Sequence, residues 1–401
     1  MIQRRIKKKF LQFLRQYPVV MLTGPRQSGK TTLCRETLPN KAYVSLENPD
    51  TREFALSDPR GFLAQYPEGL IVDEAQRAPE LFSYIQGIVD EKKKKKGLFV
   101  LTGSQNFQLL DKVNQSLAGR TAILKLLPFS MGEIKSAVRK MSLDELLLKG
   151  FYPRIYDEKL EPHHALSFYF ETYVERDVRS RLHVKDLSSF QKFVRLCAGR
   201  VGQLLNLSSL GNEAGMSHTT AREWLSLLEA SYIVFLLPPY HKNYNKRIAK
   251  APKLYFYDVG LASYLLGIET VKQMQRDPLR GHLFENLVVI EFLKNRYEQA
   301  ENSNLSFFRD SNKNEVDLIA PLQTGLWAVE IKSSQTVAPD FFKGLNYFEA
   351  LHKKEGEIKK ALVYGGGQNQ TRSNGHVVGW KGLSAFLNDA KAKRPPSKQT
   401  L

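Results

Sequence analysis

Two glycines, a lysine and a threonine near the start of the chain have the types and spacing of a phosphate-binding loop. They form the pattern Gly-x-x-x-x-Gly-Lys-Thr, after an apolar run at 19–22 and before a helical pattern. The glycines let successive backbone amides point at a polyphosphate, and the following helix adds its positive N-terminal end. We expect Lys30 to contact the β- and γ-phosphates of ATP and the Thr31 hydroxyl to hold Mg²⁺. The residues predicted to form this site are Gly24, Pro25, Arg26, Gln27, Ser28, Gly29, Lys30, Thr31 and Thr32.

Two adjacent carboxylates follow the apolar run 69–72, which predicts a strand. This pattern is typical of a Walker B motif, in which Asp73 holds the Mg²⁺ shell and Glu74 orients or deprotonates the attacking water. A third predicted strand ends in Ser104 and Gln105. Because the tips of neighbouring parallel strands line the ligand crevice, we expect one of these two side chains to sense the γ-phosphate.

A lysine run and a single arginine give weaker signals. Residues 92–96 are all lysine, which favours a solvated turn over a DNA contact. Arg120 lies between a helical pattern and an apolar strand. It is compatible with a surface charge or with a catalytic arginine finger, acting within its own chain or across the subunits of a homo-oligomer.

A second set of chemically active residues lies in the last third of the chain. Glu285 falls inside the predicted helix 281–293, whereas Asp317, Glu330 and Lys332 fall in two predicted strands joined by a glycine-containing turn. Strand alternation places Glu330 and Lys332 on one face, directed with Asp317 toward a common site. Glu285, Asp317 and Glu330 are therefore predicted ligands of Mg²⁺ or Mn²⁺ beside a scissile phosphate, and Lys332 would stabilise charge or help to activate water. The alternative is a set of solvated strand ends.

The middle of the chain has the pattern of a DNA-binding module. Residues 207–225 predict a helix, a glycine turn and a second helix that begins at Ser217. Recognition residues lie near the start of such a second helix. Predicted strands at 233–237 and 254–257 flank the basic and aromatic segment 240–247, which completes a winged-helix pattern. This favours DNA as the partner, whereas a protein-binding module or a joint between domains is the alternative. The predicted recognition positions are Ser217, His218, Thr219, Thr220 and Arg222.

Composition agrees with a polyanionic partner. Lysine and arginine total 59 against 41 acidic residues, a net charge of +18 at pH 7. Only two cysteines are present, without paired spacing, so a disulfide framework and a zinc knuckle are excluded and a cytoplasmic location is expected. No apolar run approaches the roughly 18 residues of a membrane span. Residues 1–17 predict an amphipathic helix packed on the nucleotide domain, with membrane docking as the alternative.

The combined motifs resemble the prokaryotic AAA-like (ASCE) P-loop ATPases whose C-terminal half is a domain of unknown function. The resemblance implies an ASCE-type ATPase core, a winged helix and a PD-(D/E)XK restriction-endonuclease-like domain, similar to archaeal Holliday-junction resolvases. The chain departs from that nuclease pattern at Val316, which stands where the motif has proline. The matching segments are 22–31, 71–76, 101–104, 117–120, 254–261, 281–286, 315–317 and 330–334.

Length and these resemblances together predict an α/β chain of several domains, since 401 residues exceed one ordinary core. We expect a parallel-sheet P-loop ATPase domain at 1–135 and a helical linker with a winged helix at 136–268. An α/β restriction-endonuclease-like domain is expected at 269–390 and a tail without structure at 391–401.

Two functions remain open. In the first, the ATP state controls a metal-dependent nuclease on DNA. In the second, the chain is an ATP-dependent switch that binds DNA or a protein partner without cleavage, for example in defence or signalling.

Overall fold

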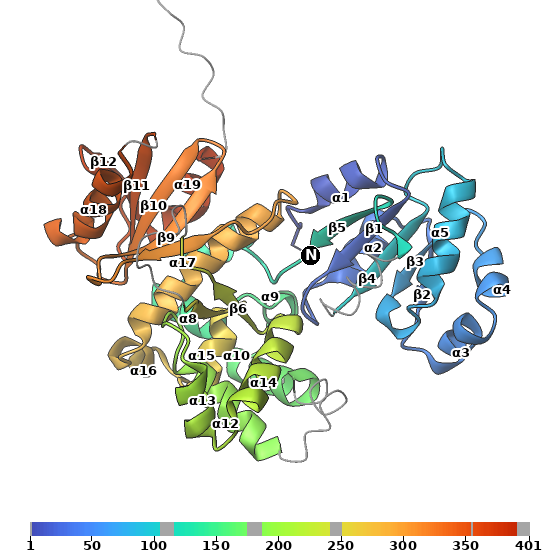
Figure 1. Cartoon of the computed structure of the whole chain (residues 1–401), viewed down its shortest axis with the longest axis horizontal. Helices are drawn as coiled ribbons and strands as arrows, with labels where there is room; N and C mark the ends of the chain where they lie inside the picture. The colour runs from blue at the N-terminus through green and yellow to red at the C-terminus, as the bar shows by residue number, and fades with distance from the viewer. Residues whose placement is uncertain (1, 105–115, 175–186, 241–250, 354–355, 391–401) are drawn as a thin grey trace, which may run out of the picture.

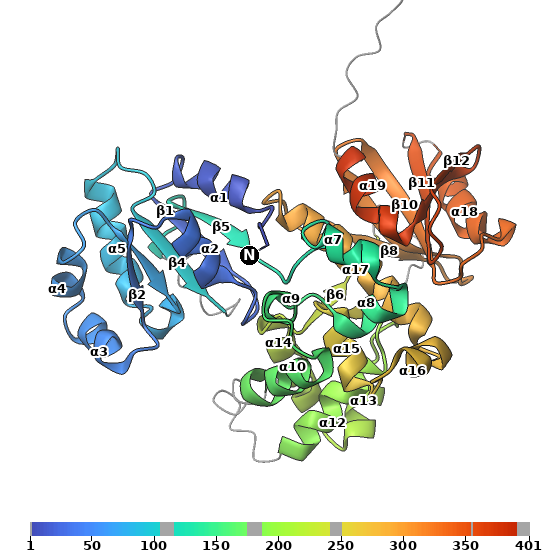
Figure 2. The ribbon, with the colours of Figure 1, turned by 180° about the vertical axis from the view of Figure 1, so that it is seen from behind.

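The computed structural model describes residues 2–104, 116–174, 187–240, 251–353 and 356–390. The predicted wing at 241–247, the tail at 391–401 and Gln105 lie outside these ranges. Figure 1 shows the N-terminal sheet and its helices as one lobe, and the helical middle with the C-terminal sheet as a second lobe. The view from behind, in Figure 2, shows that the helices that follow the first sheet lie in the second lobe.

The N-terminal lobe is built on a five-stranded parallel sheet of order β2-β3-β4-β1-β5. The central strands β1, β3 and β4 are buried along their whole length, as expected when helices cover both faces of a sheet. The predicted strands of this parallel sheet are confirmed. Their bounds are β1 (Val19–Thr23), β2 (Ala42–Ser45), β3 (Leu70–Asp73), β4 (Phe99–Gly103) and β5 (Thr121–Lys125).

Helices cover this sheet on both sides. The first, α1, buries Ile6, Phe10 and Leu14 against Val20 and Leu22 of the sheet, as the predicted packing of the amphipathic N-terminal segment requires. The lysine run at 92–96 forms an exposed turn. The remaining elements are α2 (Lys30–Thr37), α3 (Pro49–Ser57), α4 (Pro59–Ala64), η1 (Ala75–Arg77) and α5 (Leu81–Glu91), with α1 at Lys7–Leu14.

The middle of the chain is helical and contains one small antiparallel sheet, β6-β7. The predicted helix-turn-helix corresponds to α13 and α14, which are separated by Gly215 in the left-handed conformation. The elements here are α7 (Lys135–Lys140), α8 (Leu143–Lys149), α9 (Pro153–Asp157), α10 (Pro162–Tyr169), η2 (Phe170–Val174), α12 (Leu187–Ala198), α13 (Leu207–Ala214), α14 (His218–Ala230), β6 (Val234–Leu237), β7 (Lys253–Phe256), α15 (Val259–Leu265) and α16 (Val271–Arg276).

The C-terminal part is a six-stranded mixed sheet of order β12-β13-β11-β10-β9-β8. Strands β9 and β10 pair antiparallel through a tight turn, as predicted, and β10 pairs parallel with β11. The bounds are α17 (Arg280–Tyr297), β8 (Ser306–Arg309), β9 (Glu315–Leu322), β10 (Gly325–Lys332), η3 (Pro339–Phe342), α18 (Lys343–His352), β11 (Ile358–Tyr364), β12 (Gln370–Arg372), β13 (Gly375–Gly379), η5 (Trp380–Gly382) and α19 (Leu383–Asp389).

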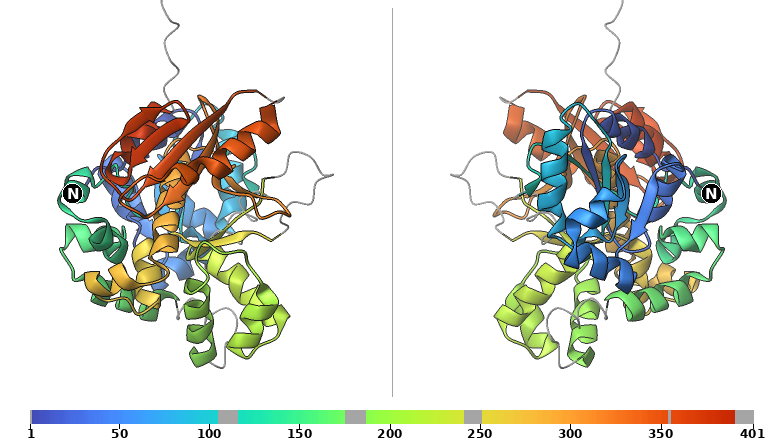
Figure 3. Two further views of the ribbon diagram at one scale, coloured as in Figure 1. Left: turned by 90° about the vertical axis from the view of Figure 1, so that its left-hand side faces the viewer. Right: turned by 90° about the vertical axis from the view of Figure 1, so that its right-hand side faces the viewer.

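Helix α17 holds the second lobe together. It is buried continuously from Leu283 to Tyr297, and its apolar side chains belong to one hydrophobic core that also includes the helical middle and one face of the C-terminal sheet. The side views of Figure 3 show the C-terminal sheet and the helical middle stacked on either side of this helix. No helix among the described residues is long and apolar enough to cross a membrane.

Candidate nucleotide-binding site and carboxylate cluster

The loop between β1 and α2 has the backbone of a phosphate-binding loop. At Gly24, φ is +146° and an added Cβ would lie 2.0 Å from the carbonyl oxygen of Leu126, so only glycine fits. Gly29 has φ +88° at the start of α2, again in the left-handed region. The Lys30 ammonium donates to the carbonyls of Gly24 and Pro25, at 2.9 and 2.7 Å. The loop is therefore closed around its own lysine.

That cavity has the size and the donors for a nucleoside triphosphate. Its volume is about 630 Å³. The hydroxyl of Ser28, in the loop beside this cavity, is buried and has no hydrogen-bond partner among the described residues. The predicted site residues that line the cavity are Arg26, Gln27, Gly29, Lys30, Thr31, Thr32, Asp73 and Glu74.

The two predicted Mg²⁺ residues of the nucleotide site lie together. The Thr31 hydroxyl donates to the Asp73 carboxylate at 2.8 Å, and the Tyr43 hydroxyl donates to the same oxygen at 2.7 Å. The second oxygen of Asp73 accepts from the Thr102 hydroxyl. A hydroxyl and a carboxylate at this separation are the hard oxygen ligands that Mg²⁺ takes beside a triphosphate. These residues therefore fit the ion.

Glu74 is held in an uncommon backbone conformation at the tip of β3. Its φ is 55°, in the left-handed region where a residue other than glycine is strained. Its carboxylate accepts from the side-chain amide of Gln76 and from the Ser104 hydroxyl, the latter at 3.3 Å. The structure thus places Ser104 next to Glu74, and a role of Ser104 toward the γ-phosphate stays a prediction.

Arg120 is not part of this site within one chain. It directly precedes β5, whose first residue pairs with Val19 at the start of β1, whereas the phosphate loop follows the other end of β1. Its guanidinium forms two hydrogen bonds with Asp90, at 2.6 and 2.8 Å. The alternative in which it acts within its own chain is not supported, because a five-residue strand separates it from the loop. A role across subunits stays a prediction.

Two arginines that the sequence motifs do not indicate line the nucleotide cavity instead. Arg4 donates to the carbonyl oxygens of Ser28 and Leu127, at 2.6 and 2.5 Å, and ties the loop to the segment after β5. Arg154 reaches the cavity from α9, where it pairs with Glu158 at 2.8 Å. The cavity is therefore walled by the ATPase sheet on one side and by the helical middle on the other.

Burial changes the titration of the loop lysine. Lys30 is 6% exposed. Burial lowers the pKa of its ammonium to about 8, and the nearby Glu74 and Asp73 offset only part of this effect. The negative charge of a bound triphosphate would raise the pKa of Lys30 further and favour its charged form.

The nucleotide loop is also connected to the second lobe by buried polar contacts. The Tyr232 hydroxyl, just after α14, donates to the hydroxyl of Thr23 at 3.0 Å, directly before the loop begins. Phe129 lines the cavity, and its carbonyl accepts from Lys294 of α17 at 2.7 Å. Both contacts lie inside the protein, where a polar group that loses its partner is costly.

The C-terminal carboxylates come together as the sequence predicted. The Lys332 ammonium lies 2.6 Å from Glu330 and 3.9 Å from Asp317. Asp317 also accepts from the backbone amide of Ile331 at 2.8 Å. We use the name carboxylate cluster for Glu285, Glu315, Asp317 and Glu330 together.

A lysine from the helical middle enters this cluster. The Nζ atom of Lys253, on β7, lies 2.9 Å from Glu285, 2.6 Å from Glu315 and 3.8 Å from Asp317. The Tyr255 hydroxyl, two residues further along the same strand, donates to Glu285. Since an ammonium already fills the space between these oxygens, the described arrangement does not fit a divalent cation, and the expectation that Glu285 completes a metal shell is not supported. Strand alternation places Lys253 and Tyr255 on one face, but it does not indicate which carboxylates they meet.

Burial and ion pairs shift the pKa values of the carboxylates in this cluster in opposite directions. Although burial opposes ionisation, Lys253 lowers the pKa of Glu285 to about 2. Burial, with Glu330 and Glu285 nearby, raises the pKa of Asp317 well above its usual range. Burial also raises the pKa of Glu330. Burial and mutual repulsion thus disfavour full charge on every carboxylate of the cluster.

The predicted recognition residues lie at the start of α14. Ser217 caps the helix by accepting from the amide of Thr220 at 3.1 Å. Ser217, His218, Thr219 and Arg222 are exposed, whereas Trp224 of the same helix is buried against Phe190 and Phe193. The helix therefore presents its polar first turn to solvent.

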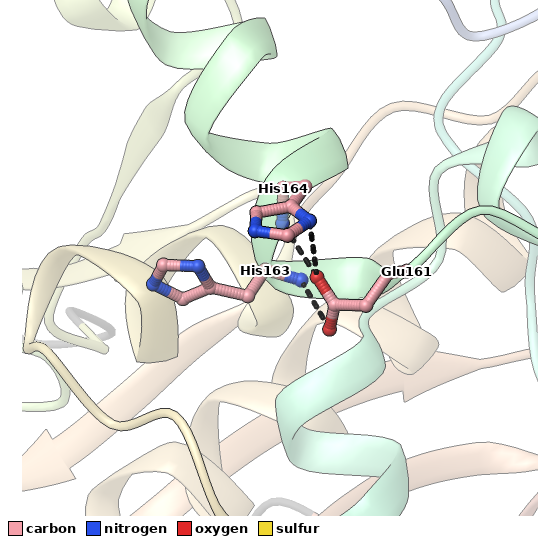
Figure 4. A group of neighbouring side chains, drawn as sticks. All are labelled: Glu161, His163 and His164. Atoms are coloured by element: carbon pink, nitrogen blue, oxygen red, sulfur yellow. Dashed lines mark hydrogen bonds and ion pairs between the residues drawn. The ribbon is translucent and has the colours of Figure 1, made fainter.

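A second group of metal-ligand residue types lies at the start of α10. Glu161, His163 and His164 place one ligand atom each within 4.8 Å of the others. Figure 4 shows the two imidazole rings pointing in different directions and the Glu161 carboxylate turned to the backbone. That carboxylate accepts from the amides of His163 and His164, at 3.1 and 2.7 Å. Helix capping therefore accounts for this group without a metal.

Three family models match successive segments of the chain. Residues 16–135 match the model described as AAA domain. Residues 140–272 and 280–383 match two domains of unknown function, DUF8612 and DUF4143. With the loop geometry above, the first match shows that the chain carries a P-loop ATPase domain.

Relatives match most of the chain. An uncharacterized protein of Mycobacterium tuberculosis, Rv2008c, is 30% identical over 343 residues, which cover 84% of this chain and 75% of the relative. The chain belongs to the family of this mycobacterial protein. An uncharacterized protein of Haemophilus influenzae is 25% identical over 300 residues, 70% of each chain.

The solved structures that align with the chain are less similar to it. A Walker-type ATPase of Pyrococcus abyssi aligns with a TM-score of 0.45 at 15% identity, over 66% of this chain and 96% of that one. AMPPCP-bound DnaA from Aquifex aeolicus aligns with a TM-score of 0.30 at 16% identity, over 56% and 86%. Neither TM-score reaches 0.5, so the ATPase assignment rests on the AAA match and on the loop itself.

Proposed function

We propose that the chain is a Mg²⁺-dependent ATPase that acts as a nucleotide switch on DNA, with α14 as the recognition helix of a winged helix-turn-helix. The observation that carries this proposal is the buried hydrogen bond between Tyr232 and Thr23. Thr23 adjoins the first residue of the phosphate loop, and Tyr232 adjoins the end of α14. A change in the loop upon nucleotide binding therefore acts directly on the helix that would contact DNA.

Each part of the ATPase site has a role in this proposal. Lys30 and the loop amides bind the phosphates, and Thr31 with Asp73 holds Mg²⁺, which neutralises phosphate charge when bound. Glu74 orients the attacking water from the tip of β3. Arg154 contributes a positive charge from α9 of the helical middle. Nucleotides with different phosphate charge in the cavity would therefore act differently on α9.

Charge and exposure support DNA as the partner. The net charge of +18 attracts a polyanion. The first turn of α14 exposes hydroxyl, imidazole and guanidinium groups, which are donors and acceptors suited to base edges and phosphates. The order of elements in the C-terminal part, a helix, three antiparallel strands, a helix and a parallel strand, is compatible with the restriction-endonuclease-like fold.

The test is the affinity for a fluorescent DNA duplex, measured by anisotropy at several salt concentrations. If the chain contacts DNA phosphates, the affinity should fall by roughly a thousandfold or more when the salt concentration rises from about 50 to 200 mM. The substitution Arg222→Ala should weaken binding, whereas Arg60→Ala, an exposed arginine on α4, should not. Weak binding with little salt dependence, or equal loss in both variants, would exclude DNA and favour a protein partner.

DNA cleavage at the carboxylate cluster is the second candidate, and it requires the Lys253 ammonium to leave the cluster so that a divalent cation can enter. The observation that favours it is the position of Asp317 beside Glu330 and Lys332 on neighbouring strands. Incubation of linear, single-stranded and branched DNA with the wild-type chain and Mg²⁺ or Mn²⁺ tests it, with Asp317→Asn as the control. Intact DNA under all of these conditions would leave binding without cleavage as the function.

A further inference from the structure

We propose that Lys253 fills the cation position of the carboxylate cluster, so that the folded chain satisfies these carboxylates without a metal ion. A divalent cation then binds among them only when the Lys253 ammonium is absent. This inference stands independently of the proposed switch on DNA.

The geometry places one ammonium at the centre of the cluster. Three carboxylates lie within 4 Å of the Lys253 nitrogen, and the lysine side chain is only 4% exposed. Mg²⁺ requires oxygen ligands at roughly 2.0–2.1 Å and Ca²⁺ at roughly 2.3–2.6 Å. An ion among the same oxygens would therefore contact the ammonium itself, and the two cations exclude each other.

Charge balance leads to the same conclusion. The four carboxylates of the cluster face three cationic side chains, Lys253, Lys332 and Arg309. An additional divalent ion would bring a local excess of positive charge into a buried region, where such an excess is poorly screened.

Lys253 is fixed in place by the strand that carries it. The next residue, Leu254, accepts from the amide of Gly202 at 2.7 Å and donates to the carbonyl of Gln203 at 3.1 Å. Tyr255 points to the same face and binds Glu285. The lysine is therefore an integral part of β7 that joins the helical middle to the C-terminal sheet, unlike a surface lysine that swings away at little cost.

The test is a titration of the nucleotide-free full-length chain with MnCl₂, followed by the electron paramagnetic resonance of the free ion. The variants are Lys253→Met and Lys253→Gln, each with and without Asp317→Asn, and the matched control is Lys343→Met, an exposed lysine on α18. We expect both neutral variants at position 253 to gain one Mn²⁺ site that is at least about tenfold tighter than any in the wild type. Asp317→Asn should remove this site, and Mn²⁺ should raise the melting temperature of the Lys253 variants alone.

Two results would overturn the proposal. The first is a wild-type chain that binds Mn²⁺ at a site abolished by Asp317→Asn, since Lys253 would then not exclude the ion. The second is a Lys253 variant with a native circular dichroism spectrum that gains no Mn²⁺ site. If neither neutral variant folds, the comparison of wild type with Asp317→Asn decides alone, because equal Mn²⁺ binding supports the proposal and unequal binding refutes it.

Discussion

Binding of ATP is expected to take up a proton at Lys30 under alkaline conditions. Without nucleotide, burial lowers the pKa of this ammonium to about 8. A triphosphate beside Nζ favours the charged form, so the pKa rises in the complex. At pH 9 only about one-tenth of the free chain carries the proton, so binding should take up about 0.9 proton, against about 0.5 at pH 8 and about 0.1 at pH 7.

The sign of the pH dependence follows from this uptake. Because the complex holds more protons than the free chain above pH 8, the affinity for ATP should fall as pH rises, by up to about tenfold per pH unit. Isothermal titration calorimetry in two buffers of different ionisation enthalpy measures the uptake directly. In Lys30→Arg the guanidinium stays protonated, so a variant that still binds ATP should show no uptake.

An uptake below about 0.2 proton at every pH from about 7 to 10 would show that Lys30 remains fully charged without nucleotide. Equal uptake by the wild type and by Lys30→Arg would show that another group supplies the effect.

The remaining predictions concern the catalytic and coupling residues. Glu74→Gln should retain ATP binding and lower kcat by roughly a hundredfold or more, measured by phosphate release; an unchanged kcat would remove Glu74 from the mechanism. Arg154→Ala should weaken ATP binding by about tenfold or more in calorimetry, whereas Arg60→Ala should leave it unchanged; equal affinities would place Arg154 outside the phosphate contacts. Tyr232→Phe should cost about 1 kcal/mol in chemical denaturation, keep ATP hydrolysis and abolish the effect of nucleotide on DNA affinity; a retained effect would mean that coupling takes another route.

The local part of the nucleotide site could be predicted from the sequence. The spacing of Gly24, Gly29 and Lys30 specifies a loop whose backbone has few alternatives, and Asp73 follows an apolar run that can only be a buried strand. Because parallel strands place their carboxyl ends at one edge, the contact between Thr31 and Asp73 follows from topology. The same topology places Arg120 at the opposite end of a strand in that sheet, away from the phosphate loop of its own chain.

The long-range contacts could not be predicted in this way. The contact between Lys253 and Glu285 joins a strand of the helical middle to the buried helix α17, and no local pattern specifies which carboxylate a buried lysine meets. Arg154 reaches the cavity because α9 packs beside the loop, which depends on how the two lobes dock. The sequence therefore indicated the chemistry of each part, and tertiary packing determined which charges neutralise one another.

The central claim is that the nucleotide at the P-loop controls DNA affinity through the second lobe. The most direct measurement compares the affinity of Glu74→Gln for one labelled duplex with ATP bound and with ADP bound, at a single salt concentration. Because this variant is expected to hydrolyse ATP at least about a hundredfold more slowly, the two states compared differ only in the γ-phosphate. The account predicts dissociation constants that differ by about tenfold or more, a coupling free energy of about 1.4 kcal/mol. Equal dissociation constants in a variant that binds both nucleotides would contradict it.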